Sequence, residues 1–306
     1  MSTTATSATS AKSSPTRSAS TFFRRHRRLS LASVLGGPVA WMLIIYIGSL
    51  LLMVISAFFV LDSFTQKPTD EFTLDNIDTA FTTWAYVTVV LKSVAVAAAV
   101  TAVCLVIALP TAFYIAKVAA PWMRRGLIVA VLMPLWAGYL VKGYAWKAML
   151  RPSSEFGIDK NGGFLESTFG WTPGFGWLAV VLSLSYLWLP YMVLPIYAGL
   201  DRLPDSLLDA SGDLGARPGR TFRSVVMPML IPATAAGSIF TFSLSLGDFI
   251  TPNLVTEGKV QMIGNLIART LGAPNQPLAA AFTLWPLVIV IVYLAGMKRL
   301  GAFDNL

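Results

Sequence analysis

The sequence predicts an all-α protein that crosses a membrane several times, and three observations predict it. Of the 306 residues, 55% are hydrophobic and only 12% are charged, whereas a soluble domain usually carries about 25% charged residues. Long runs without any charge alternate with short charged segments. The net charge of +8 lies mainly between these runs, which favours a role in membrane orientation over nucleic-acid binding.

Six stretches are apolar over the length that a membrane-spanning helix needs, which is about 20 residues. The predicted spans cover 36–61, 87–116, 125–148, 176–200, 229–252 and 277–298. The first run is too long for the apolar part of a signal peptide, and no small-residue cleavage site follows it. Prolines within the spans are expected to kink their helices; they are Pro110, Pro134, Pro190, Pro195 and Pro232.

Charges predict the orientation of these spans. Residues 1–30 are rich in Ser, Thr and Ala and are predicted to be a disordered cytosolic tail, followed by one transmembrane domain over 31–306. Of the 23 Lys and Arg residues, fifteen fall in the tail, the 117–125 turn, the 201–226 loop and the C-terminus, and five fall in the opposite loops. By the positive-inside rule, both termini are predicted to be cytosolic.

Residues that could perform chemistry are scarce. Cys104 is the single cysteine and His26 the single histidine, which excludes an internal disulfide, a cysteine-built zinc site and a catalytic triad. No Gly-x-x-x-x-Gly-Lys-Ser/Thr phosphate loop is present. The sequence therefore predicts a protein that is not an enzyme and binds no cofactor itself.

The most informative segment is the predicted cytosolic loop 201–228 between the fourth and fifth spans. A short helix is expected from Pro204 to Gly215, with Asp205 favourable in its first turn and Gly215 suited to end it. Adjacent spans can be joined by a few residues, so this loop is expected to have another purpose. Its helix suits docking into a groove of a soluble partner or resting on the membrane surface, and the residues alone leave both open.

The spacing within this loop resembles the signature of ABC importer permeases, which is Glu-Ala-Ala, three residues, Gly, nine residues, Ile, one residue, Leu-Pro. The pattern falls here on Asp209-Ala210-Ser211, Gly215, Val225 and Met227-Pro228, with four departures at Asp209, Ser211, Val225 and Met227. Asp209 has a shorter side chain than the family's glutamate. The resemblance implies that the 204–215 helix couples the chain to an ATPase through Asp209, Ala210, Ser211, Asp213, Leu214, Gly215, Val225 and Pro228.

The resemblance also implies the surroundings of the chain. It implies the type I importer permease fold with six spans in the bacterial inner membrane. A cytosolic ATPase dimer that binds ATP and Mg²⁺, a second permease subunit, and an extracytoplasmic substrate-binding protein are the partners implied. Residues 243–252 and 261–265 look like permeases of spermidine/putrescine importers. Permeases for ferric iron, sulfate, thiamine or phosphonates share this architecture and are the alternatives.

Asp248 is the acid most suited to a substrate pathway. It follows Pro228 by about 20 residues, which is about 30 Å along a helix and places it near the outer end of the fifth span. A carboxylate there is placed to meet an ammonium group of a polyamine, or it simply ends a helix in interfacial water. Trp136 and Trp188 either anchor span ends in the interface or face a cavity and attract cations.

Three rival functions remain at this stage. An ion-driven secondary transporter is expected to carry ionisable residues deep in several spans and often an internal repeat, and these spans carry almost none. A membrane-embedded enzyme would need acids, histidines or a nucleophile clustered at one depth. A purely structural subunit is opposed only by the spacing of the coupling signature.

Overall fold

The computed structural model describes residues 27–62, 64–65, 67–153, 162–273 and 275–299. Most of the predicted disordered tail lies outside these residues. The helix α2 (Arg27–Ser56) begins at Arg27, so residues 27–30, which we assigned to the tail, are helical. The chain divides into two compact units, 1–55 and 56–306. Residues 35–56 of α2, all but the last of which belong to the first unit, are long and apolar enough to cross a membrane.

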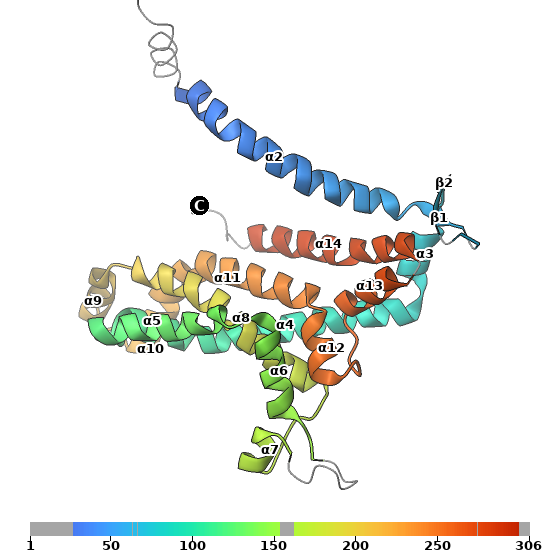
Figure 1. The fold of residues 1–306 in the computed structure, drawn as a ribbon. Coiled ribbons are helices and arrows are strands. Elements are labelled where there is room, and N and C mark those ends of the chain that lie inside the picture. The colour runs from blue at the N-terminus through green and yellow to red at the C-terminus, as the bar shows by residue number, and fades with distance from the viewer. Residues whose placement is uncertain (1–26, 63, 66, 154–161, 274, 300–306) are drawn as a thin grey trace, which may run out of the picture. The chain divides into compact units, whose positions relative to one another are not determined.

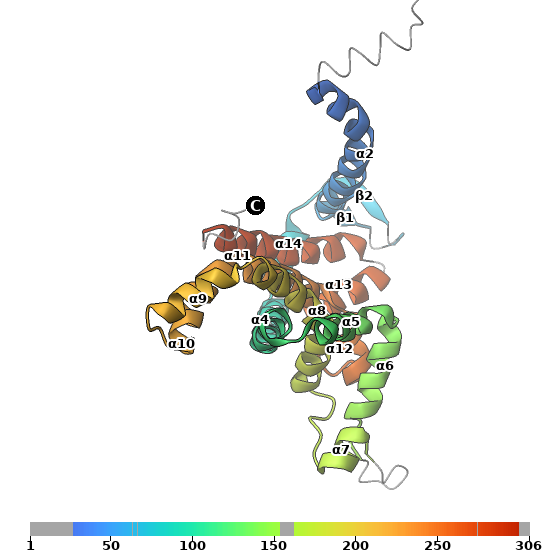
Figure 2. The same cartoon turned by 90° about the vertical axis from the view of Figure 1, so that its left-hand side faces the viewer.

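The second unit is built on three long helices that pack side by side, α4 (Trp84–Phe113), α8 (Trp177–Asp201) and α11 (Met227–Gly247) (Figures 1 and 2). Small residues allow this close approach, as is usual between membrane helices. A Cβ atom on Gly237 of α11 would lie 2.8 Å from the Sδ atom of Met192 on α8. The helix α14 (Gln276–Arg299) also contacts α11.

The third predicted span, 125–148, is a bent pair of helices instead of one continuous helix. The helices α5 (Pro121–Trp136) and α6 (Tyr139–Leu150) meet at an angle of 94°. Ala137 and Gly138 between them have extended backbones. Pro134 cannot donate an amide hydrogen bond, which weakens the helix just before the break. Five helices of the described residues can each span a membrane, and the count reaches six if this bent pair is one span.

Two further boundaries differ from prediction. The fifth span ends at Gly247, and the chain continues as the short helix α12 (Ile250–Thr256), because Asp248 has an extended backbone. In the 201–228 loop, the helix α9 (Asp205–Asp213) is followed by α10 (Pro218–Thr221) and the π-helix η2 (Phe222–Val226). Residues 218–247 are helical throughout, so the second half of the predicted loop belongs to the fifth span's helix.

The remaining elements lie at the ends of this bundle. A π-helix η1 (Tyr114–Val118) follows α4, and α9 and α10 lie at the same end (Figure 1). The opposite end carries α12 and α13 (Ile263–Gly272). The short elements are an antiparallel pair, β1 (Phe59–Leu61) and β2 (Pro68–Phe72), with α3 (Asp75–Thr82) and α7 (Phe164–Phe169).

Candidate functional site

The helix α9 has the ends that the sequence predicted. Pro204 precedes it in an extended conformation, and Asp205 is its first residue. Gly215 follows it with a φ of +74°, a left-handed conformation that strains other residue types. The Gly215 N–H donates to the Gly212 carbonyl (2.8 Å), and the Ala216 N–H donates to the Ser211 carbonyl (3.1 Å). These bonds satisfy carbonyls at the helix end, so the predicted extent of this helix is confirmed.

The predicted coupling residues divide into two groups in the structure. Five of them lie on the exposed surface of α9 and its end, where the Leu214 side chain is 89% exposed; they are Asp209, Ala210, Asp213, Leu214 and Gly215. Ser211 is half-buried, and its hydroxyl lies 2.8 Å from that of Thr221 on α10. Val225 is half-buried within η2, and Pro228 is exposed in α11.

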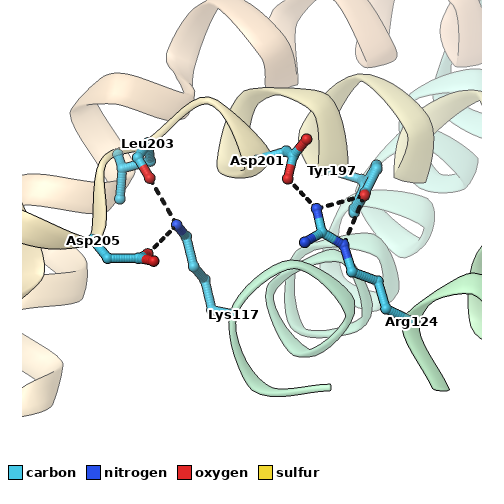
Figure 3. A network of polar contacts seen from close by, with 6 residues as sticks. All are labelled: Lys117, Arg124, Tyr197, Asp201, Leu203 and Asp205. Atoms are coloured by element: carbon cyan, nitrogen blue, oxygen red, sulfur yellow. Dashed lines mark hydrogen bonds and ion pairs between the residues drawn. The ribbon is translucent and has the colours of Figure 1, made fainter. Parts of the chain in front are cut away.

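Two cations, one in η1 and one near the start of α5, hold the connection between α8 and α9 (Figure 3). The Lys117 ammonium donates to the Leu203 carbonyl (2.7 Å) and pairs with Asp205 (2.6 Å). The Arg124 guanidinium donates to the Tyr197 hydroxyl and to the Asp201 carboxylate, both on α8. Sequence reasoning assigned both cations to membrane orientation alone and missed these contacts, because their partners lie 73 to 88 residues away.

Asp248 is buried at the other end of the bundle, where its carboxylate accepts four hydrogen bonds. Its Oδ1 atom accepts the N–H groups of Ile250 (2.9 Å) and Thr251 (3.0 Å). Its Oδ2 atom accepts the Thr251 hydroxyl (2.9 Å) and the hydroxyl of Tyr139 on α6. The carboxylate therefore satisfies the first turn of α12 and ties it to α6, a structural role that the sequence did not predict.

The same carboxylate borders a cavity of about 340 Å³. The rings of Tyr139 and Trp188 lie on its wall, with centroids 6.1 Å apart. Trp136 is 88% exposed at the end of α5 and is not among the lining residues. The structure thus brings together Asp248 and Trp188 of the predicted pathway residues, but not Trp136. Tyr139 was noted in the sequence only as one of several aromatic residues.

The segment 261–265 braces this corner. A Cβ atom on Gly264 would lie 2.9 Å from the Gly247 carbonyl oxygen and 3.0 Å from that of Asp248. The Asn265 amide donates to the Phe249 carbonyl (2.7 Å). The two segments that carried the resemblance to polyamine permeases, 243–252 and 261–265, are therefore in contact. Among the described residues, no group of three or more His, Cys, Asp or Glu side chains is placed to hold a metal ion.

The chain is similar to known transport proteins over most of its length. Residues 31–301 match the family described as binding-protein-dependent transport system inner membrane component. The inner membrane ABC transporter permease protein YdcU of Escherichia coli is 43% identical over 93% of this chain and 94% of its own. The spermidine/putrescine transport system permease protein PotB of Escherichia coli is 30% identical over 76% of this chain and 84% of its own.

A solved structure shares the fold. The bacterial alginate ABC transporter in complex with an alginate-bound periplasmic protein has a chain that superimposes with a TM-score of 0.66, at 13% identity, over 90% of this chain and 96% of that one. This likeness concerns the fold alone. The family match over 31–301 and the 43% identical relative establish that the chain belongs to the binding-protein-dependent inner membrane transport components, as a multi-pass permease subunit of an ABC importer. Such a subunit works with an ATPase and a substrate-binding protein.

Proposed function

We propose that this permease subunit moves polyamines such as spermidine and putrescine into the cytosol, driven by a separate ATPase dimer that docks on α9. The similarity to spermidine/putrescine permeases of several bacteria supports the substrate class. The observation that carries the coupling role is the exposed helix α9, which ends at a left-handed Gly215 and presents Leu207 and Leu214 to the outside. Apolar side chains on such a helix suit a groove in a soluble partner.

In this proposal the α9 end of the bundle faces the cytosol, together with both termini. The excess of Lys and Arg in the 117–125 turn and the 201–226 loop supports that orientation. The opposite end, with α7, α12 and α13, then faces the binding protein that delivers the substrate. A second permease subunit completes the pathway, and the ATPases bind ATP and Mg²⁺. Closure of the ATPases displaces α9, and the differential contacts at α9 shift the helices between outward-facing and inward-facing states.

The cavity beside Asp248 is the proposed place for one ammonium group of the polyamine. Because the carboxylate already accepts four hydrogen bonds, we propose that it attracts the ammonium through its charge instead of binding it directly. The ring faces of Tyr139 and Trp188 line the same cavity. A desolvated cation over an aromatic ring gains about 2 kcal/mol or more. Trp136 stays a prediction for the pathway.

The coupling role is tested by capture of the ATPase. The chain is purified from membranes intact and with Asp209→Arg and Leu214→Asp together, two changes at exposed positions of α9. We expect the intact chain to retain the ATPase and the double variant to lose it. Glu71→Arg with Leu74→Asp is the matched control, since both side chains are exposed and lie near β2 and α3. Equal capture by all three inserted chains would contradict docking on α9.

The substrate class is tested by uptake. Cells that lack other polyamine importers are supplied with the complete transport system and with radiolabelled spermidine. We expect accumulation that depends on ATP and is blocked by excess putrescine. Accumulation of ferric iron, sulfate, thiamine or a phosphonate, with no spermidine uptake, would move the chain to one of the alternative substrate classes while leaving its permease role intact.

A further inference from the structure

Lys117 binds both ends of the short connection between α8 and α9. Its ammonium lies 2.7 Å from the Leu203 carbonyl oxygen, at the corner after α8, and 2.6 Å from the carboxylate of Asp205, the first residue of α9. The Lys117 side chain is only 11% exposed, whereas that of Asp205 is 78% exposed. A single buried cation therefore fixes the position at which α9 begins (Figure 3).

The backbone that carries Lys117 is itself unusual. Residues 114–118 form the π-helix η1, which ends with the Ala119 N–H donating to the Tyr114 carbonyl (2.9 Å). A second π-helix, η2, follows α9 and α10 in the sequence. Its Phe222 meets Phe113, the last residue of α4, edge to face, with ring centroids 5.9 Å apart. Single π-turns inside helices occur often at functional sites. One of them, η1, carries the lysine that contacts the start of α9.

Arg124 completes the contact from the other side of the same turn. It binds Tyr197 and Asp201 in the last two turns of α8, and its guanidinium carbon lies 5.3 Å from the centre of the Tyr197 ring. The neighbouring Arg125 is exposed, and its side chain makes none of the hydrogen bonds or ion pairs found within the described part of the chain. Of three cations at this turn, two are used to hold the α8–α9 corner.

These contacts fix the position of α9 more than they stabilise the fold. The carboxylates of Asp201 and Asp205 are 49% and 78% exposed, and ion pairs with an exposed partner are screened by water and salt and contribute about 0–1 kcal/mol to stability. Removing one of them should leave the bundle folded, because the core of α4, α8 and α11 does not depend on it. What is lost is the fixed geometry between α9 and the α4–α5 turn.

We propose that Lys117 is a positioning residue for energy coupling. It fastens α9 to the α4–α5 turn, so that a displacement of α9 by the ATPase is passed to α4 and α5 as well as to the covalently connected α8 and α11. The proposal rests on the proposed role of α9 as the ATPase-docking helix. Without Lys117, the ATPase still binds α9, but movement of α9 no longer reaches α4 and α5 in full, and hydrolysis becomes uncoupled from transport.

The test uses the complete complex of both permease subunits and the ATPase in liposomes. ATPase content, basal ATP hydrolysis and hydrolysis stimulated by the loaded binding protein are measured for Lys117→Met, Lys117→Arg, Asp205→Asn and Arg125→Met. For Lys117→Met we expect unchanged ATPase content, with stimulation reduced about tenfold, which is within the usual range of coupling between two sites. Asp205→Asn keeps the contact between Lys117 and the Leu203 carbonyl, so its stimulation should fall less than that of Lys117→Met. Lys117→Arg should retain most of the stimulation, and Arg125→Met all of it.

The outcomes distinguish failure of the positioning role of Lys117 from failure of the proposed function. Stimulation in Lys117→Met equal to that of Arg125→Met would overturn the positioning role. Loss of the ATPase from the Lys117→Met complex would also overturn it, because the residue would then serve docking. If Lys117→Met does not fold, an Asp205→Asn complex with full stimulation would count against the proposal in its place. Absence of the ATPase from the intact complex would instead mean that the proposed function has failed.

Discussion

Asp248, at one end of the bundle, and Asp201 and Asp205, at the other, are held in opposite ways. At the α9 end, Asp201 is half-exposed and Asp205 is mostly exposed, and they pair with cations on α5 and η1. At the α12 end, Asp248 is buried, and its four hydrogen bonds come from uncharged groups. Exposed ion pairs exchange easily with water, whereas a buried, fully bonded carboxylate fixes its neighbours. In the proposed function, the α9 end moves with the ATPase, whereas the α12 end holds a cavity in shape.

The largest expected effect comes from removing the buried carboxylate. In Asp248→Ala, the N–H groups of Ile250 and Thr251 and the Tyr139 hydroxyl lose their acceptor. Each buried donor left unpaired costs about 1–3 kcal/mol. The unfolding temperature of the purified chain in detergent should therefore be clearly lower than that of the intact chain.

Asp248→Asn separates the structural role from the charge. The amide keeps an oxygen for the start of α12 and removes the charge that the proposed function assigns to polyamine attraction. We expect a smaller loss of stability than in Asp248→Ala, with loss of spermidine uptake. A stable Asp248→Asn chain that transports spermidine normally would show that the carboxylate acts only as a structural group.

The second effect concerns the close approach of α13 to the same corner. A Cβ atom on Gly264 would lie within about 3 Å of two backbone carbonyl oxygens, whereas a Cβ atom on Gly247 would meet nothing within 4 Å. Overpacking of this kind costs typically about 1–3 kcal/mol. Gly264→Ala should therefore lower the unfolding temperature and Gly247→Ala should not, as measured on the two chains side by side. Equal unfolding temperatures of Gly264→Ala and Gly247→Ala would mean that this corner yields easily and is not held rigidly in shape.

The contrast between the ends also explains what the sequence could predict. The ends of α9 were predictable because their signals are local: Pro204 and Asp205 start the helix, and Gly215 ends it. The environment of Asp248 was not, since Tyr139 lies 109 residues away in sequence and only the packing of α6 against α12 brings it near. The break between α5 and α6 was not predicted for the same reason. A proline and a glycine permit a bend, but the packing of the surrounding helices decides its angle.

A third effect is expected at the link between α6 and α12. Tyr139→Phe keeps the aromatic ring on the cavity wall and removes one hydroxyl, which bonds to Asp248 and lies 2.5 Å from the Thr251 hydroxyl. A single hydrogen bond to a charged group contributes about 1.5–3 kcal/mol, and the remaining three bonds to Asp248 persist. We expect a modest loss of stability with spermidine affinity retained, because the ring remains. Loss of affinity without loss of stability would assign the hydroxyl itself to the substrate.

The smallest effect on stability, with a large effect on function, is expected at Leu214. Its side chain is 89% exposed in the isolated chain, and substitutions at exposed positions usually change stability by less than about 0.5 kcal/mol. Leu214→Ser should therefore unfold like the intact chain while capturing less of the ATPase, and Leu74→Ser, at a comparably exposed position beside α3, should change neither. A destabilised Leu214→Ser chain would mean that α9 depends on this side chain for its own packing. The end that we describe as built for a partner would then resemble the buried corner around Asp248.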